Sequence, residues 1–587
     1  MSSIQEEVQS PLSQHLVPSA AAAVHRWLND VAFAEFWAEI QRLITNEDWE
    51  TLNNNFYQHI EFGTGGIRGT TGVGPNRINH RTIGESAQGL INYLREIHPD
   101  KALSVVIAYD TRLSSVDLAQ YAAGVFAANG CTTYLFDGFR STPELSFAVR
   151  DLTTDAGIVV SASHNPPADN GFKVYNESGG QIVPEVGDII IERVKHVTDI
   201  ATMPYEEALA AGKITLIGSD LDERYCQAVL NESVGEYRSA TLVYSPIHGA
   251  GLTSVLPVLQ KAGFDVMTVE SQMSPDGHFP NVPNNIPNPE VVEANGAAQD
   301  LMVTTGRDLA LTNDPDADRL AAVVATKSGP VFLNGNQIAS LITYYVFSTL
   351  EEQGRLPKNG FLARTIVTTP LIDRVGEKYG LKVYNDLLVG FKYVGDLIRR
   401  KQDHGDEIFL LGGEESFGML KGSYVRDKDG AVAALMLAEL ASKLKDQGKT
   451  LVDALDDAYR SYGYYSEHLS FIFFEGMTGA QTRDKLMASL RDDPPATLGG
   501  FKVGKVTHQV QDSAGTYIVK YELEGVEAEV FVRPSGTEPK VKFYVLLRDG
   551  RAEGMTGDIT GVKHEADAIV EKIDREIMAI AKDRTTK

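Results

Sequence analysis

From about residue 62 onward, short apolar runs alternate with longer amphipathic segments, and this alternation constrains the fold most strongly. The run Leu103–Ala108 has the character of a buried strand, and the segment 116–128 that follows it reads as a helix ending at Asn129 and Gly130. The alternation recurs at Gly157–Val160, Thr241–Tyr244 with 251–262, Leu309–Thr312, Leu320–Ala325 with 336–353, and Thr365–Val367 with 370–379. Such alternation predicts α/β domains with largely parallel sheets.

Both ends of the chain depart from this pattern. Large apolar residues in the first 58 positions recur at three- and four-residue spacing, which predicts helices. The C-terminal part instead predicts strands joined as hairpins, closed by a helix over 562–582, with loops at 491–500 and 548–557. These strands are Leu469–Phe474, Ile518–Leu523, Ala528–Val532 and Val541–Leu547.

The 587 residues exceed what one hydrophobic core can organise, and length alone predicts about four domains. Two similar turns, Ser141–Pro143 and Thr368–Pro370, each lead from a strand into a helix and indicate a repeated α/β unit. The predicted fold is three consecutive similar α/β domains with mixed, largely parallel sheets, followed by a C-terminal α+β domain. The predicted boundaries are 1–237 (helical extension and domain I), 238–345 (domain II), 346–465 (domain III) and 466–587 (domain IV).

Charge and composition exclude several classes of function. The net charge is −25, and so acidic a surface is a poor partner for nucleic acid, because phosphate binding needs a basic face. No stretch approaches the roughly 18 consecutive apolar residues of a membrane span, and Glu6 and Glu7 stand where a secretory signal would carry basic residues. Cys131 and Cys226 have no zinc or redox spacing. We expect a cytoplasmic protein.

A loop with reactive side chains follows the strand that ends at Val160. The loop Ser161–Pro166 lies beyond the carboxyl end of that strand, where α/β proteins hold reactive groups. Lys173, on the segment that follows, is a candidate proton acceptor for this loop. An ordinary turn is the alternative interpretation, since Ser, Asn and Pro are common turn residues.

A second loop, Asn313–Arg319, carries three alternating aspartates, Asp314, Asp316 and Asp318. Three carboxylates that converge without a cation repel one another, and hard oxygen ligands suit Mg²⁺, so the pattern favours a metal site over a solvated acidic turn. An EF-hand is excluded, because its sixth position needs Gly and is Arg319. A phosphatase with an aspartate nucleophile stays open, although a third carboxylate exceeds what that chemistry requires.

Three further loops carry polar or glycine-rich motifs. Arg533–Lys540 could form an anion-binding nest of backbone N–H groups with two added cations, or it is a hairpin loop with incidental charges. Gly412–Gly418 could bind sugar hydroxyls through its carboxylates, or cap the next helix. Gly63–Gly69 fits neither a dinucleotide fingerprint nor a Walker loop, because Arg68 stands at the third glycine position and no Gly-Lys-Ser/Thr follows.

Taken together, these motifs resemble the α-D-phosphohexomutase superfamily over nearly the whole chain. Their order matches as well as their content: Gly65–Gly69, Ser161–Pro166, Asp314–Arg319, Gly413–Ser416 and Arg533–Lys540. The helical start that leads into Glu61–Gly65 looks most like the phosphoglucomutase-2-like branch, which also holds phosphomannomutases and phosphopentomutases. The resemblance implies four domains around one central cleft, with one functional loop contributed by each.

The resemblance also implies a role for each motif residue. Ser163 would carry the phosphate and, together with Asp314, Asp316 and Asp318, hold Mg²⁺. Lys173 and Arg68 would act near the transferring phosphoryl group, and His164 would shape the loop. The implied substrate-binding residues are Arg319, Lys392, Glu414, Ser416, Arg533, Ser535, Gly536, Thr537 and Lys540.

The reaction implied by the resemblance is the interconversion of glucose 1-phosphate and glucose 6-phosphate through a phosphoserine enzyme. Glucose 1,6-bisphosphate would be both the intermediate and an activator. Phosphomannomutase, phosphopentomutase and sugar bisphosphate synthase activities stay open as alternatives. The expected partner is a small phosphosugar, bound by a monomer or homodimer. A serine hydrolase is disfavoured, because the chain has no Gly-x-Ser-x-Gly elbow.

Overall fold

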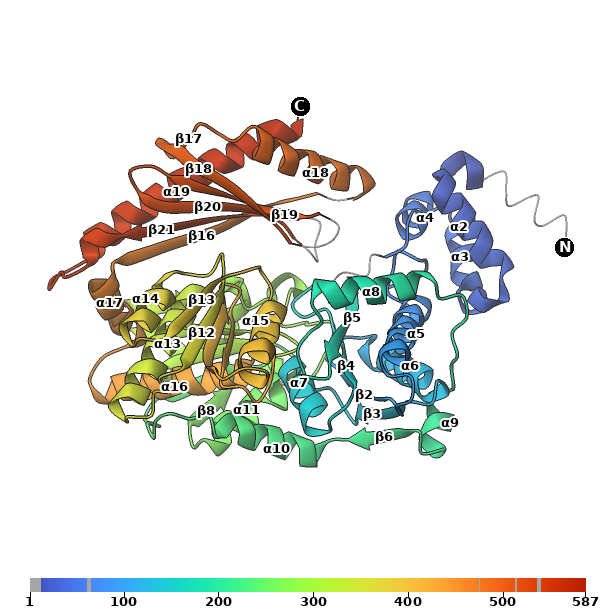
Figure 1. The fold of residues 1–587 in the computed structure, drawn as a ribbon, viewed down its shortest axis with the longest axis horizontal. Coiled ribbons are helices and arrows are strands. Elements are labelled where there is room, and N and C mark those ends of the chain that lie inside the picture. Colours follow the sequence, from blue (N-terminus) through green and yellow to red (C-terminus); the bar gives the residue numbers. More distant parts are fainter. Residues whose placement is uncertain (1–11, 61–64, 475, 512–514, 536–539, 587) are drawn as a thin grey trace.

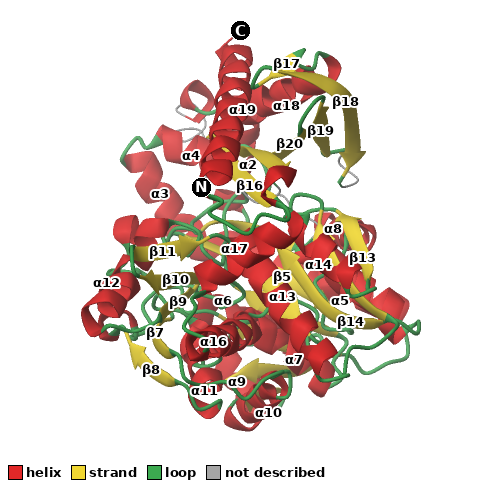
Figure 2. Ribbon diagram, turned by 90° about the vertical axis from the view of Figure 1, so that its left-hand side faces the viewer, coloured by secondary structure: helices red, strands yellow, loops and turns green. Residues whose placement is uncertain are grey.

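The computed structural model describes residues 12–60, 65–474, 476–511, 515–535 and 540–586. It contains three mixed α/β sheets and one antiparallel sheet, as the alternation pattern predicts. Figures 1 and 2 show the antiparallel sheet and its long C-terminal helix on one side of the other three sheets. None of the helices in the described part of the chain has the length and apolar character that a membrane crossing requires.

The N-terminal extension is helical, as its spacing predicts, and forms a separate small core. Trp27 stacks on Phe33 with 4.5 Å between ring centroids and meets the edge of Phe56 at 5.5 Å. These aromatic side chains join the helices into one unit beside domain I (Figure 1). The helices are α2 (Pro18–Asn29), the 3₁₀ helix η1 (Val31–Phe36), α3 (Trp37–Thr45) and α4 (Trp49–Phe56).

The first sheet has the strand order β1-β5-β4-β2-β3-β6. The last four strands in this order are parallel, whereas β5 runs antiparallel to both β4 and β1. Its strands are β1 (Gly66–Thr70), β2 (Ser104–Tyr109), β3 (Thr132–Phe136), β4 (Ala156–Val160), β5 (Asp169–Asn176) and β6 (Ile214–Ile217). Its helices are α5 (His80–Ile97), α6 (Ser115–Ala128), α7 (Thr142–Asp151), α8 (Pro184–Lys195), α9 (Tyr205–Ala210) and α10 (Ser219–Leu230).

The second sheet, ordered β11-β10-β9-β7-β8, is parallel from β8 to β9 and ends in an antiparallel hairpin pair. Its strands are β7 (Thr241–Ser245), β8 (Asp265–Thr268), β9 (Leu309–Asn313), β10 (Leu320–Thr326) and β11 (Gly329–Leu333). Its helices are α11 (Val255–Lys261), α12 (Gly296–Thr305) and α13 (Gly335–Glu352), with the short 3₁₀ turns η2 (Ala250–Leu252), η3 (Glu270–Gln272), η4 (Pro283–Asn285) and η5 (Val292–Asn295).

The third sheet, ordered β13-β12-β14-β15, repeats this plan with three parallel strands and one antiparallel strand. Its strands are β12 (Gly360–Thr365), β13 (Lys382–Leu387), β14 (Ile408–Glu414) and β15 (Gly418–Lys421). Its helices are α14 (Leu371–Lys378), α15 (Phe391–Ile398), the π-helix η6 (Arg399–Asp403), α16 (Gly430–Asp446) and α17 (Leu451–Tyr462).

The fourth sheet is antiparallel, in the order β16-β21-β20-β19-β18-β17. Its strands are β16 (Tyr464–Phe473), β17 (Thr497–Leu498), β18 (Phe501–Val510), β19 (Tyr517–Leu523), β20 (Glu527–Pro534) and β21 (Lys540–Asp549). Its helices are α18 (Gly476–Asp492), the short η7 (Gly550–Ala552) and α19 (Thr560–Thr586). The predicted C-terminal α+β domain is confirmed, while the predicted domain boundaries stay a prediction.

Four sequence-based assignments differ from the structure. The strand predicted at Thr365–Val367 is instead β12, which ends at Thr365, because the Gly and Arg at its ends interrupt the apolar run. Strand β18 gave no apolar signal because most of its side chains are exposed. Helix α18 was not predicted at all, and the loop predicted at 491–500 contains the short strand β17.

A buried carboxylate on α16 joins α13 to the segment 233–238 that leads into the second sheet. Glu439 is fully buried and accepts hydrogen bonds from the Tyr345 hydroxyl (3.0 Å) and from the backbone N–H of Gly235 (3.2 Å). The Arg238 guanidinium lies 3.1 Å from the same carboxylate. Since residues 233–238 connect the first sheet to the second, this carboxylate fixes how the two sheets meet α16.

Removing this carboxylate should destabilise the fold. Glu439→Ala leaves buried donors and a cation without their acceptor, so we expect a loss of about 3 kcal/mol and a clear drop in Tm in thermal unfolding. Glu352→Ala is the matched control: Glu352 pairs with Lys443 at 3.2 Å but is 63% exposed. An equal drop for both variants would contradict the role assigned to Glu439.

Candidate active site

Ser163 lies in a constrained loop directly after β4. Its backbone has a φ of 51°, the left-handed region that most side chains avoid. Its N–H donates to Ser161 Oγ at 2.8 Å, and its own hydroxyl donates to Asp314 Oδ2 at 2.6 Å. The side chain is buried, so the loop aims the hydroxyl of Ser163 directly at the aspartate loop of the second sheet.

Arg112 fixes the shape of this loop, and the sequence did not single it out. Arg112 follows the carboxyl end of β2, the strand next to β4. This position beside the serine loop could have indicated its role from the sequence. Arg112 Nε lies 3.3 Å from Asp110 Oδ2. Its guanidinium donates to the carbonyl oxygens of Ser163 (2.5 Å), Asn165 (2.5 Å), Pro166 (2.7 Å) and Asp169 (3.0 Å).

The three aspartates converge in the turn between β9 and β10. One carboxylate oxygen of each lies within 4.8 Å of the others, and all three side chains are buried. Burial, with the neighbouring carboxylates, raises the pKa of Asp314 well above its usual range. Asp316 differs: burial would raise its pKa, but the Lys173 ammonium at 2.5 Å holds it well below its usual range.

The free oxygens of this cluster fit a hard divalent cation. Thr142 Oγ1 and Lys173 Nζ both bind Asp316 Oδ2, at 2.8 and 2.5 Å. No residue that the structure describes donates a hydrogen bond to Asp316 Oδ1 or Asp318 Oδ1, although both atoms are buried. Buried carboxylate oxygens without donors are costly unless a cation binds them, so this donor set suits Mg²⁺.

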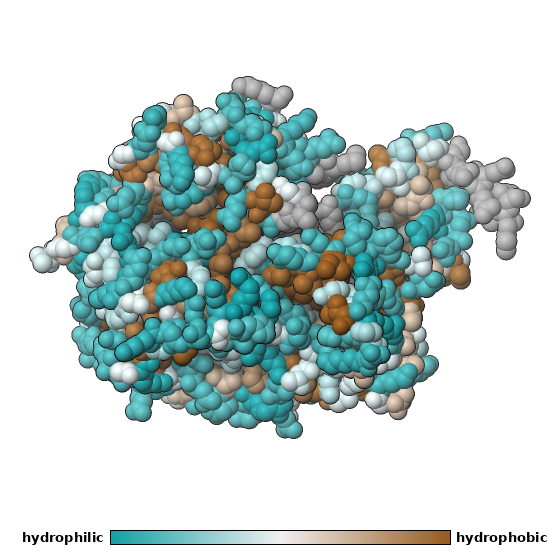
Figure 3. All heavy atoms as spheres, viewed as in Figure 1, coloured by the Kyte–Doolittle hydropathy of each residue, from teal (hydrophilic) through white to brown (hydrophobic). Residues whose placement is uncertain are grey.

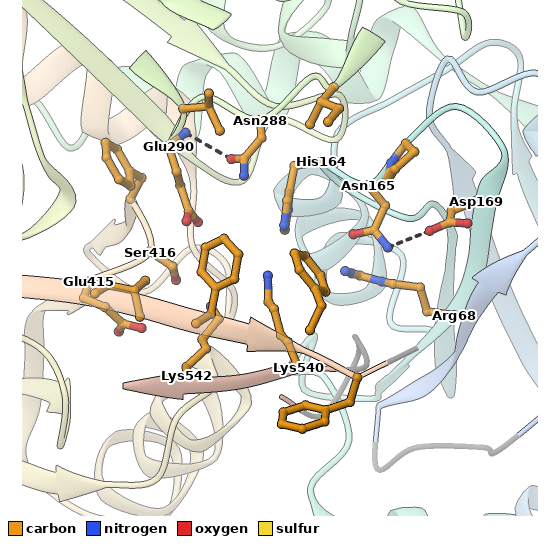
Figure 4. A pocket seen from close by; sticks show the side chains of 18 of the residues that line it. Arg68, His164, Asn165, Asp169, Asn288, Glu290, Glu415, Ser416, Lys540 and Lys542 are labelled. Carbon is orange, nitrogen blue, oxygen red and sulfur yellow. Dashed lines mark hydrogen bonds between the residues drawn. The ribbon is translucent and has the colours of Figure 1, made fainter. Parts of the chain in front are cut away.

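A cavity of about 1280 Å³ opens between the serine loop and the fourth sheet. Figure 4 shows Arg68, His164, Lys540 and Lys542 projecting toward it from opposite walls. Burial lowers the pKa of His164 well below its usual range, and nearby Arg319 and Arg68 lower it further. The predicted residues that line the cavity are Arg68, His164, Ser416 and Lys540; Asn288, Glu290, Glu415 and Lys542 line it without having been predicted.

The described residues that line this cavity do not include Glu414, Arg319 or Lys392, which are also predicted to bind substrate. Glu414 is buried at the end of β14, and burial raises its pKa to about 7. Arg319 pairs with Glu290, and Lys392 Nζ lies 5.4 Å from the Tyr393 ring.

The fourth-domain loop is described in part. Arg533 Nε donates to Gln511 Oε1 at 3.3 Å, and the N–H of Ser535 donates to the Lys540 carbonyl at 2.8 Å. Gly536 and Thr537 lie outside the described residues. The roles of the predicted substrate residues stay predictions.

Three family models match the chain in order. They are the phosphoglucomutase/phosphomannomutase alpha/beta/alpha domains I, II and III, over residues 59–200, 223–329 and 334–462. The predicted resemblance to the α-D-phosphohexomutase superfamily is confirmed, and the chain belongs to the phosphoglucomutase/phosphomannomutase family, a family of mutases.

Individual proteins of this family are similar to the chain over most of its length. A phosphoglucomutase of Staphylococcus saprophyticus subsp. saprophyticus is 34% identical over 517 residues, covering 85% of this chain and 92% of that protein. The open form of pp63/parafusin, a phosphoglucomutase of Paramecium, shares the fold with a TM-score of 0.65 at 16% identity, covering 90% of this chain and 96% of its own. A family protein of Burkholderia thailandensis has a TM-score of 0.63 at 19% identity, covering 89% and 97%.

The contacts of Arg112 predict that it positions the serine loop. Arg112→Lys would keep the charge but reach fewer carbonyls, and a misplacement of about 1 Å at a reacting group can lower turnover about 100-fold. Phosphosugar turnover should fall by that order. Tm should fall as well, because Lys leaves buried carbonyl oxygens without a donor, so turnover is compared at a temperature where the variant is folded. Arg150→Lys is the control, because Arg150 donates to the Ser178 carbonyl (2.9 Å) in the same domain. Normal turnover by a folded Arg112→Lys protein would refute the positioning role.

Proposed function

We propose that this protein is a phosphoglucomutase that interconverts glucose 1-phosphate and glucose 6-phosphate through a phosphate carried on Ser163. The observation that carries the proposal is the 2.6 Å contact between Ser163 Oγ and Asp314 Oδ2, which puts a strand-end hydroxyl against the buried aspartate cluster. The cation-lined cavity beside it has room for a hexose bisphosphate.

In the proposed reaction, the P–O bond to Ser163 Oγ breaks as a bond to the free sugar hydroxyl forms. The proton lost by that hydroxyl ends on Ser163 Oγ, and Lys173 is the group proposed to carry it. To accept the proton, Lys173 must react as the neutral amine and not as the ammonium that pairs with Asp316. Mg²⁺ held by the three aspartates would offset the negative charge of the phosphoryl group. Arg68 faces the same space and would stabilise the charge that develops in the transition state.

The bisphosphate then turns over and returns its other phosphate to Ser163. Arg533, Ser535, Gly536, Thr537 and Lys540 are proposed to hold the phosphate that is not reacting. Lys542 is added to this group, because it lines the same wall of the cavity. If the intermediate escapes, free glucose 1,6-bisphosphate would rephosphorylate Ser163, which is why we propose it as an activator.

The preference for glucose rests on the relatives. The 34% identical protein from Staphylococcus saprophyticus subsp. saprophyticus is named a phosphoglucomutase. Glu414 and Ser416, with Glu415 beside them, are proposed to contact the sugar hydroxyls. Phosphomannomutase activity is the second candidate, because the three matching domains are shared by both kinds of enzyme.

The cellular compartment and the oligomeric state are also part of the proposal. Cys131 and Cys226 are buried and form no disulfide, which fits a reducing compartment, and we propose the cytoplasm. A monomer or homodimer stays a prediction.

Ser163 should carry the phosphate. After incubation with glucose 1,6-bisphosphate, peptide mass spectrometry should find phosphate on Ser163, and Ser163→Ala should lose both the phosphate and the turnover. Ser178→Ala serves as the control, since it removes a hydroxyl of the same domain whose hydrogen bond, to Asn176 Oδ1 at 2.7 Å, lies outside the serine loop. Phosphate found on Ser161, or full turnover by Ser163→Ala, would sink the assignment.

Glucose 1-phosphate should be the preferred substrate. Glucose and mannose differ only at carbon 2, so one unpaired polar group would discriminate by about 1–3 kcal/mol, a preference without exclusion. The measurement compares kcat/KM for glucose, mannose and ribose 1-phosphates with added bisphosphate. If kcat/KM for mannose or ribose 1-phosphate exceeds that for glucose 1-phosphate by tenfold or more, the glucose assignment is wrong, whereas the mutase assignment stands.

A further inference from the structure

The segment between β15 and α16 crosses from the third sheet to the first two. In this segment, the N–H of Arg426 donates to Ser146 Oγ on α7 at 2.8 Å. Asp427 accepts a hydrogen bond from the hydroxyl of Tyr175 on β5 at 2.7 Å. Just beyond it, the N–H of Gly430 donates to the Ala317 carbonyl inside the aspartate turn at 3.1 Å. The segment is therefore fixed from both sides.

Lys428, at the centre of this segment, reaches the aspartate cluster. Its Nζ lies 2.8 Å from Asp318 Oδ2 and 3.5 Å from Asp427 Oδ1, and its side chain is only 13% exposed. Asp318 Oδ1, the other oxygen, is buried and accepts no hydrogen bond from any described residue, although Arg319 Nε lies 3.9 Å from it. Lys428 thus occupies one oxygen of Asp318 and leaves the second available.

The same division of oxygens occurs at Asp316. There Thr142 and Lys173, both from the first sheet, bind Oδ2, and Oδ1 is left without a donor. Two aspartates of the cluster are therefore held in the same way, by a lysine from another domain. This repetition indicates that the lysines orient their carboxylates and do not merely neutralise them.

We propose that Lys428 is a positioning residue for the metal site: it holds Asp318 so that Oδ1 faces the cation. This inference rests on the metal site proposed above. Partners that orient a metal ligand typically contribute about 10- to 100-fold in metal affinity. The hydrogen bond from Tyr175 to Asp427 keeps Lys428 in place, so it should contribute indirectly.

Removing Lys428 has two opposite effects on the affinity for a divalent cation, so the direction of the change shows which effect dominates. Loss of a positive charge near the site would by itself strengthen binding of a divalent cation. Loss of the hold on Asp318 would weaken binding. A positioning role therefore predicts weaker binding, and a charge that only happens to lie nearby predicts unchanged or tighter binding.

The test measures the Kd of the full chain for Mn²⁺. Mn²⁺ is titrated into the protein without substrate, and electron paramagnetic resonance monitors the free ion. Lys428→Met should raise the Mn²⁺ Kd about tenfold or more, and Lys428→Arg should restore most of the affinity. Lys421→Met is the matched control: Lys421 lies on β15, pairs with Glu232 outside the third sheet, and is 12% exposed. Its substitution should leave the Mn²⁺ Kd unchanged.

Unchanged or tighter Mn²⁺ binding by Lys428→Met, or an equal loss in Lys421→Met, overturns the proposal. If Lys428→Met does not fold, Tyr175→Phe decides: a several-fold rise in Kd supports the role, and an unchanged Kd overturns it. Asp316→Asn separates the two proposals. If it loses Mn²⁺ while Lys428→Met does not, only the role of Lys428 fails; if the unsubstituted protein binds no Mn²⁺, the metal site and the role of Lys428 fail together.

Discussion

Three buried carboxylates within 4.8 Å of one another repel strongly, and the arrangement of the first three domains follows from offsetting that repulsion. Each domain contributes a cation to the cluster: Lys173 from the first sheet at 2.5 Å from Asp316, Arg319 within the turn itself, and Lys428 from the third at 2.8 Å from Asp318. No single domain could assemble this charge balance alone. The site therefore exists only when the domains are packed together, which links correct folding to the chemistry.

The same logic explains how an acidic protein can bind a phosphorylated ligand. The net charge is −25, so the overall field disfavours anions. Figure 3 shows that the face turned to the viewer is largely hydrophilic. Arg68, Lys540 and Lys542 are nevertheless collected in one cavity, where low-dielectric walls strengthen their local field. The doubly phosphorylated intermediate that we propose would then be attracted inside the cavity and repelled outside it, which would favour its retention between the two proposed transfers.

The sequence predicted what is local and missed what depends on contacts between domains. Buried strands such as β9 and the loops after them carry dense apolar and polar signals, so the serine loop and the three aspartates could be singled out from the sequence. The role of Ser163 came from the family resemblance and stays a prediction. Strand β18 is exposed along most of its length and has no such signal. Lys428 could not be recognised, because its role comes from a carboxylate in another domain. Arg112 was marked only by its position after β2, since its carbonyl partners lie 51 to 57 residues further along the chain. Glu414 was found by its motif, but only packing shows that it is buried.

The backbone at Ser163 has a consequence for how this lineage can change. A side chain at a φ of 51° costs about 1 kcal/mol, and glycine would adopt that conformation without strain. A glycine here would forfeit the contacts of the Ser163 hydroxyl with Asp314 Oδ2 (2.6 Å) and His164 Nδ1 (3.2 Å), a loss of about 1–3 kcal/mol. Relief of the backbone strain would therefore offset part of this loss. The strained backbone thus lowers the stability cost of losing the hydroxyl, and a protein without it could fold while lacking the nucleophile that we propose.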